Sequence, residues 1–142
     1  MSRNKYRIRN HNLIVKATPL AGFISAVINT TILIAGTLTG LITPQVLVLG
    51  EPLNSLQVIL FSISTAVLAG IWLLVLGRVS RRWAWEAFQI SLLVGFIVLC
   101  ANPFLYSPSI PFGMSMILIL MHLVPFILIF LFFQKQAIAR AV

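Results

Sequence analysis

His122 is the residue best suited to chemistry, because it lies in a long apolar stretch and its ring can bind a metal or a proton. A neutral imidazole at that depth could coordinate the magnesium of a chlorophyll, fill one axial position of a haem, or relay a proton. Pro125 follows three residues later and has no backbone N–H, so the Met121 carbonyl loses its helical hydrogen bond. The pair predicts a polar, slightly opened place in the middle of a helix.

A structural role for His122 is the interpretation favoured by the sequence. A single histidine in a membrane helix commonly pairs with a carbonyl, hydroxyl or amide of a neighbouring helix, and Asn29 or Gln89 could supply that group. A haem held by two histidines would need a second membrane histidine, which requires two copies of the chain. We therefore expect no cofactor, and a tetrapyrrole bound through His122 is the alternative.

The sequence lacks the other arrangements that support catalysis. The interior of the apolar stretches contains no carboxylate, Cys100 is the single cysteine, and no CxxC pair, phosphate-binding loop or Ser-His-Asp set occurs. A small proton-coupled exporter would need a glutamate in its first span, where this sequence has Asn29. We therefore expect the protein not to be an enzyme and to have no metal site.

The composition is that of an integral membrane protein. Hydrophobic residues make up 60% of the 142 residues and charged residues 8%, and the mean hydropathy is +1.06. A soluble domain with a polar surface would not reach these values. The net charge of +8 is confined to the ends of the chain and one turn. Anionic lipid headgroups are therefore the expected partner, and nucleic acid is not.

The hydropathy pattern predicts an all-α fold, an antiparallel bundle of four transmembrane helices. Each apolar stretch can cross a hydrocarbon core of about 30 Å. The expected spans are residues 17–42, 53–76, 85–101 and 113–133. They form one transmembrane domain, residues 17–134, between a basic tail (1–16) and a short C-terminal segment (135–142).

All ten lysine and arginine residues lie in the tail, the turn between the second and third spans, or the C-terminal segment. Basic residues are retained on the cytoplasmic side of membranes, so this distribution predicts that both termini are cytoplasmic. Glu51 is then the one charged residue of the outer links. The residues expected to bind lipid headgroups are Arg3, Lys5, Arg7, Arg9, Lys16, Arg78, Arg81 and Arg82.

Prolines and charges predict where the helices end. The tail is expected to lie on the headgroups without a fold of its own, with Pro19 in the first turn of the first helix. Asn102-Pro103 is expected to end the third span. Glu86 is expected to pair with Arg82, four residues earlier. For the outer link 43–52, an extended loop is favoured over a re-entrant or partner-binding segment, and link 102–113 is expected to form an interfacial cap.

Small and polar residues mark the faces where helices should meet. The small pairs, four residues apart, are Gly22/Ala26, Gly36/Gly40 and Ala66/Gly70. This spacing lets two backbones approach closely, and nearby polar groups can form hydrogen bonds across the contact. The intramembrane polar and packing positions that we single out are Asn29, Gly36, Gly40, Gln89 and Pro125.

Two short patches resemble a known family. Ala26-Val27-Ile28-Asn29 in the first span and Leu120-Met121-His122-Leu123-Val124-Pro125 in the last are together similar to a bacterial family of small four-helix membrane proteins of unassigned function. The resemblance implies four helices, a bacterial membrane and special interest in Asn29 and His122. It implies no activity.

These observations predict a non-enzymatic accessory or scaffold subunit in the bacterial cytoplasmic (inner) membrane, packed against a second copy or against other membrane subunits. A small transporter or channel is the alternative. A pigment-binding or haem-binding subunit that uses His122 is the second alternative.

Overall fold

The computed structural model describes residues 6–8, 11–42, 47–48, 51–80, 83–106 and 110–140. In this part of the chain, four long helices account for most residues. The helices are α1 (His11–Leu38), α2 (Ser55–Val79), α3 (Ala84–Tyr106) and α4 (Phe112–Ala137). The short strands are β1 (Tyr6–Ile8), β2 (Leu47–Val48), β3 (Glu51–Pro52) and β4 (Ile138–Arg140). The predicted all-α four-helix fold is confirmed.

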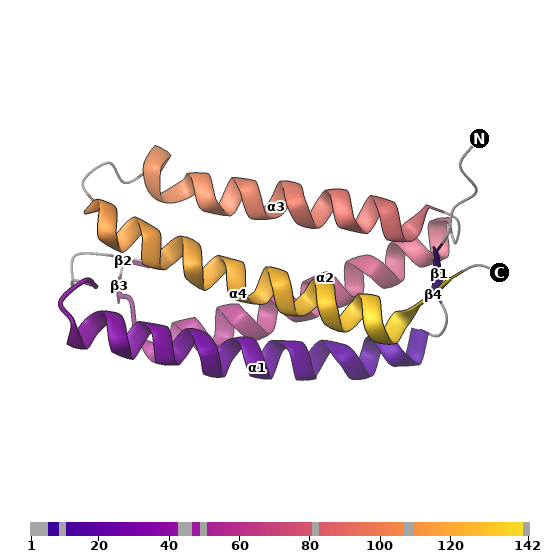
Figure 1. Ribbon diagram of the computed structural model, residues 1–142, viewed down its shortest axis with the longest axis horizontal. Coiled ribbons are helices and arrows are strands. Elements are labelled where there is room, and N and C mark those ends of the chain that lie inside the picture. The colour runs from indigo at the N-terminus through magenta and orange to yellow at the C-terminus, as the bar shows by residue number, and fades with distance from the viewer. Residues whose placement is uncertain are drawn as a thin grey trace.

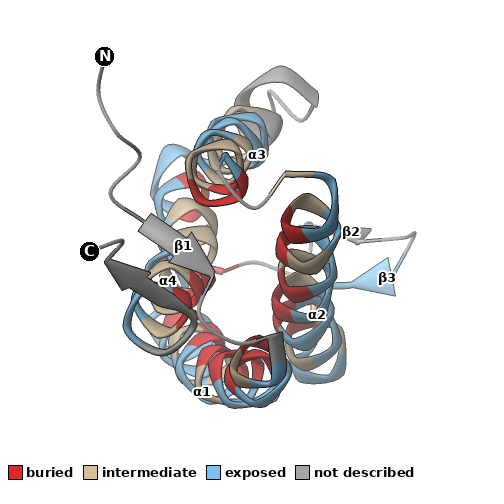
Figure 2. Cartoon of the chain, turned by 90° about the vertical axis from the view of Figure 1, so that its right-hand side faces the viewer, coloured by how far each residue is buried: buried red, intermediate tan, exposed pale blue. Residues whose placement is uncertain are grey.

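The helices run side by side along the long axis of the molecule (Figure 1). Helix α1 packs mainly against α2 and α4, and α3 packs against α4 and α2 with little contact to α1. Seen from the end, the buried faces of α1, α2 and α4 turn toward one another, whereas α3 shows mostly exposed and half-buried residues (Figure 2). Most buried residues therefore lie between α1, α2 and α4, and α3 adds Trp85 and Phe88, near its start, to the same core.

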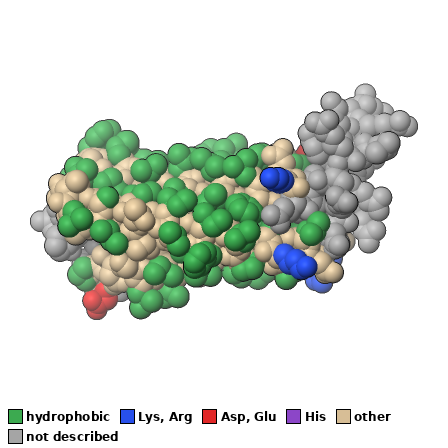
Figure 3. All heavy atoms as spheres, turned by 60° about the horizontal axis from the view of Figure 1, so that its bottom comes forward, with side chains coloured by type: hydrophobic (Ala, Val, Ile, Leu, Met, Phe, Trp, Pro, Cys, Tyr) green, Lys and Arg blue, Asp and Glu red, His purple; other side chains and the backbone are tan. Residues whose placement is uncertain are grey.

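The outer surface of the helices is apolar. All four helices are long and apolar enough to cross a membrane, and green hydrophobic side chains cover the face in Figure 3. In water such a surface would drive aggregation, whereas in lipid it is solvated. The protein is a multi-pass membrane protein.

The two ends of the chain meet at one end of the bundle. Strand β1 pairs antiparallel with β4, with Tyr6 opposite Arg140 and Ile8 opposite Ile138. The expectation that the tail has no fold of its own is wrong for these residues. It is also wrong for residues 11–16, because α1 begins at His11 rather than at Ala17. At 1.5 Å per residue, the 28 residues of α1 extend about 42 Å, so the helix continues past the hydrocarbon core.

The earlier start of α1 changes the position of Pro19. This proline lies inside the helix rather than in its first turn. Its missing N–H leaves the Val15 carbonyl without a helical partner, which membrane helices tolerate where neighbouring groups compensate locally. The adjacent Thr18 hydroxyl donates to the Ile14 carbonyl at 2.8 Å.

Helix α1 also ends earlier than predicted, at Leu38 rather than Ile42. Gly40 has a φ of 72°, the left-handed conformation that favours glycine after the end of a helix. A Cβ atom at Gly40 would meet nothing within 4 Å, so this glycine ends the helix and makes no helix contact in the chain. The predicted packing role of Gly40 is wrong within the monomer.

The third helix is longer than predicted. Helix α3 continues through Pro103 to Tyr106, so Asn102-Pro103 does not end it. Proline removes one backbone donor, and a membrane helix can continue past that loss. In the other outer link, β2 and β3 form an antiparallel pair with Leu47 opposite Pro52, so the described residues are extended as favoured.

Helix α2 begins as its sequence allows. Asn54 caps it, with the Gln57 N–H donating to Asn54 Oδ1 at 3.1 Å and the Asn54 N–H donating to Gln57 Oε1 at 3.0 Å. This reciprocal pair satisfies two donors that a helix start would otherwise leave free. The cap fixes where α2 leaves the β2–β3 link.

Candidate functional site

The close contact between α1 and α2 depends on the small residues identified in the sequence. A Cβ atom at Gly22 would lie 3.2 Å from Ala66 Cβ and 3.3 Å from Ile63 Cα. On the other helix, a Cβ atom at Gly70 would collide with the Thr18 side chain. The two small motifs therefore pack against each other within one chain. Gly36 is also buried, facing Ile42 and Ile117 of α4.

Asn29 joins three helices at the centre of the bundle, and we call this arrangement the Asn29 junction. Its Nδ2 group donates to Ser62 Oγ of α2 at 3.0 Å and to the Met121 carbonyl of α4 at 2.9 Å. The Met121 carbonyl is the one that Pro125 deprives of its helical partner. Asn29 thus supplies the missing donor.

The Asn29 junction has no ionisable group. Asn29 is 4% exposed and Ser62 is 4% exposed. The Asn29 Oδ1 atom and the Ser25 hydroxyl oxygen are also buried, and neither has a hydrogen-bond partner. Amide, hydroxyl and carbonyl groups do not gain or lose a net charge near neutral pH. These groups can therefore hold the helices together but are not suited to general acid–base catalysis.

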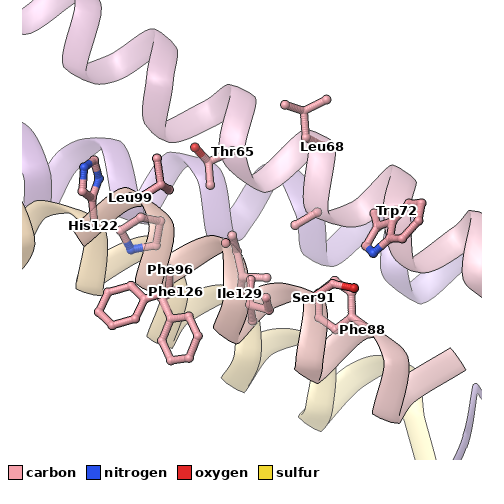
Figure 4. Close-up of a pocket in the computed structure, with 14 residues that line it drawn as sticks. Thr65, Leu68, Trp72, Phe88, Ser91, Phe96, Leu99, His122, Phe126 and Ile129 are labelled. Atoms are coloured by element: carbon pink, nitrogen blue, oxygen red, sulfur yellow. The ribbon is translucent and has the colours of Figure 1, made fainter. Parts of the chain in front are cut away.

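His122 lies on the other side of α4, in a groove of about 300 Å³ between α2, α3 and α4. We call it the His122 groove. Figure 4 shows the imidazole at one end, Thr65 further along, and Ser91 with Trp72 toward the opposite end. The lining residues are Thr65, Leu68, Ala69, Trp72, Phe88, Ser91, Leu92, Gly95, Phe96, Leu99, His122, Pro125, Phe126 and Ile129.

The imidazole of His122 has no hydrogen-bond partner among the described residues. The expectation that Asn29 satisfies it is wrong, because Asn29 Nδ2 donates to Ser62 and to the Met121 carbonyl, and Asn29 Oδ1 accepts from no described residue. Gln89 is half-buried on α3 and does not line the groove. The sequence singled out Asn29 and His122 together, whereas Asn29 lies where α1, α2 and α4 meet and His122 lines the groove between α2, α3 and α4.

Several groove residues were not singled out by sequence reasoning. The aromatic wall includes Phe96 and Phe126, whose ring centroids are 4.7 Å apart, and Gly95 leaves open space where a side chain would stand. The available signal was the i, i+4 spacing of Ser91, Gly95 and Leu99, which places all three on one face of a helix.

The described residues contain no cluster of three or more histidine, cysteine or acidic side chains that could hold a metal ion. Cys100 is half-buried on α3. Glu86 has one buried carboxylate oxygen without a partner among the described residues. Its predicted partner, Arg82, lies outside the described residues.

Charge separates along the bundle. Lys16, Arg78 and Lys135 are exposed and lie toward the ends of α1, α2 and α4 that are near the β1–β4 pair, whereas Glu51 is exposed in β3, at the opposite end of the bundle. Figure 3 shows blue side chains toward one end and the larger red patch toward the other. Of the other residues predicted to bind headgroups, Arg7 lies in β1 at the same end. Arg3, Lys5, Arg9, Arg81 and Arg82 lie outside the described residues.

Four apolar helices, three of them joined at the centre by one amide, define a small helical-bundle membrane protein. Residues 10–137 match the family of unknown function DUF6069, and the chain belongs to this family. No curated protein and no solved structure matches the chain.

Proposed function

We propose that the protein is a non-enzymatic accessory or scaffold subunit of a membrane assembly. The observation that carries this proposal is the Asn29 junction, in which the central polar groups of three helices bind one another. A transporter or channel needs polar groups along a water-filled path. Here the hydroxyls of Thr18, Thr37 and Ser91 each donate to the carbonyl four residues earlier on the same helix.

The proposed membrane is the bacterial cytoplasmic membrane, with both termini inside the cell. Support comes from the position of Lys16, Arg78 and Lys135 at the terminal end of the bundle and of Glu51 at the other. Basic residues favour the cytoplasmic side, and anionic headgroups there would attract them.

Cysteine scanning tests the absence of a water path. Single cysteines at Ser25, Asn29 and Ser62 should stay unreactive toward a membrane-impermeant thiol reagent in intact cells, whereas a cysteine at exposed Glu51 should react. The native Cys100 is first replaced by alanine. Reaction at all three buried positions would favour the transporter.

Photo-crosslinking in native membranes tests the subunit role. A photoreactive amino acid is placed at one exposed position on each helix, namely Phe23, Leu68, Val98 and Leu131. A subunit should give an adduct of one defined size from some of these positions, because a bound partner covers one face of the bundle. Irradiated samples with no adduct at any position would refute the proposal.

A further inference from the structure

The His122 groove has the form of a binding site that opens toward lipid. Its floor is formed by Phe88 and Ile129, which are 1% and 0% exposed. Its rim includes Leu68, Trp72 and Leu99, which are all exposed. A molecule in the groove would therefore touch a fixed apolar floor while part of it extends into the membrane.

Two donors of the groove have no partner among the described residues: an imidazole N–H of His122 and the indole N–H of Trp72, which lie toward opposite ends of the groove (Figure 4). The Thr65 hydroxyl donates to the Phe61 carbonyl at 2.8 Å, and the Ser91 hydroxyl donates to the Ala87 carbonyl at 2.8 Å. Their oxygens keep free acceptor positions. His122 has an N–H with no acceptor and a second nitrogen that can accept. A ligand that carries an oxygen able to accept from His122 would satisfy a group that is costly to leave unpaired in lipid.

The size and depth of the groove restrict the ligand. A cavity of about 150 Å³ holds a benzene molecule, so about 300 Å³ suits one or two fused rings and is too small for a tetrapyrrole. His122 is ten residues into α4, about 15 Å from its start and near the middle of the membrane. A phospholipid headgroup would not reach this depth, and an acyl chain would leave the imidazole unpaired.

We propose that the His122 groove binds the ring of a lipid-soluble quinone or quinol. One ring oxygen pairs with the His122 imidazole, and the ring lies against the aromatic and aliphatic wall that includes Phe96 and Phe126. The apolar tail leaves across the rim at Leu68 and Trp72. This binding is independent of the accessory role proposed above.

The test uses the full chain in bilayer discs of synthetic lipid and the probe 2-methyl-1,4-naphthoquinone. Saturable quenching of tryptophan fluorescence is expected, because Trp72 lines the groove, and this component should vanish in Trp72→Phe. The matched compound 2-methylnaphthalene has the same rings but no carbonyl. It should bind at least several-fold more weakly, because it cannot accept a hydrogen bond from His122.

Three groove variants at two positions and one outer-face control complete the test. His122→Leu should raise the Kd roughly three- to tenfold, the cost of one lost hydrogen bond, whereas His122→Gln keeps a donor and should bind more tightly than His122→Leu. Gly95→Leu should abolish saturable binding, because the new side chain has open space to fill. Val98→Leu, at an exposed position of the same helix, should bind like the wild type.

Unsaturable quenching in the wild type would overturn the proposal. Equal affinities for 2-methylnaphthalene and 2-methyl-1,4-naphthoquinone would also overturn it, because binding would then need no hydrogen bond from His122. An unchanged Kd for the naphthoquinone in Gly95→Leu would overturn it as well. Gly95→Leu keeps the proposal falsifiable if His122→Leu does not fold.

Discussion

Asn29 and His122 are polar residues of the apolar bundle that differ in their hydrogen-bond partners. Asn29 is buried and donates to two acceptors on two other helices, whereas His122 lines a groove and has no partner among the described residues. A polar group buried with partners holds helices together, and one without a partner is available to a ligand. Asn29 thus holds helices together, and His122 is the residue for which we propose a role in ligand binding.

Pro125 and Asn29 should be energetically coupled. Asn29→Leu leaves the Met121 carbonyl and Ser62 hydroxyl without this donor, and should lower the free energy of unfolding by about 1–3 kcal/mol. Pro125→Ala restores the N–H that can bond to Met121, so the loss caused by Asn29→Leu should be smaller in that background. The free energy of unfolding in detergent is measured for the wild type, the two single variants and the double variant, which together form a double-mutant cycle.

Thr31→Val is the control for this cycle, because Thr31 binds the Val27 carbonyl on an exposed face of the same helix. It should change the stability by less than about 0.5 kcal/mol. Strictly additive effects of Asn29→Leu and Pro125→Ala would contradict the coupling.

At the scale of elements, α1 and α2 form a tight pair and α3 is held more loosely. Glycines show the difference. Gly22 and Gly70 lie where a Cβ atom would press on the opposite helix, whereas a Cβ atom at Gly95 on α3 would meet nothing within 4 Å. Close backbone approach strengthens the dispersion contacts between helices, so the first pair has little tolerance for added atoms.

Gly70→Ala should destabilise the bundle by about 1–3 kcal/mol through overpacking. The obstacle is Thr18, whose hydroxyl is fixed by its bond to the Ile14 carbonyl. Thermal unfolding in detergent measures the change, with Gly95→Ala as the matched control that should be neutral or slightly stabilising.

Thr18→Ala removes the atoms that the new methyl group would meet, so it should recover part of the stability lost in Gly70→Ala. The contact between Gly70 and Thr18 would be disproved if Gly70→Ala and Gly95→Ala unfolded at the same temperature.

At the scale of the whole molecule, one end of the bundle is basic and also holds strands β1 and β4. The pairing of β1 with β4 places the termini together, which is consistent with an even number of membrane crossings. We propose that this basic end faces the cytoplasm, because lysine and arginine residues are enriched on the cytoplasmic side of membranes.

Reporter fusions test that orientation. Fusions after Lys16, Arg82 and Val142 should report a cytoplasmic location, and a fusion after Gly50 should report the outer side. An enzyme that is active only outside the cytoplasm, fused at the same four positions, serves as the reciprocal control. Outer-side activity of the Arg82 fusion would reverse the proposed topology.

The sequence predicted the four helices because apolar length is a local property that every span carries by itself. The helix ends were predicted less well. Helix α1 begins among polar residues, at His11, and α3 continues past Pro103. The Asn29–Met121 bond joins residues 92 positions apart, and no local pattern specifies such a pair. The groove was missed because its wall combines residues of three helices.

The contacts of α1 with α4, and of β1 with β4, join the first part of the chain to the last. A ribosome makes these parts in order, so the contacts of α1 with α4 can form only after α4 has been synthesised. Ser62 on α2 becomes available to Asn29 before Met121 does. The packing of the bundle is thus completed only by its last helix. A nascent chain that ends before residue 121 would lack the Met121 carbonyl, the second acceptor of the Asn29 amide.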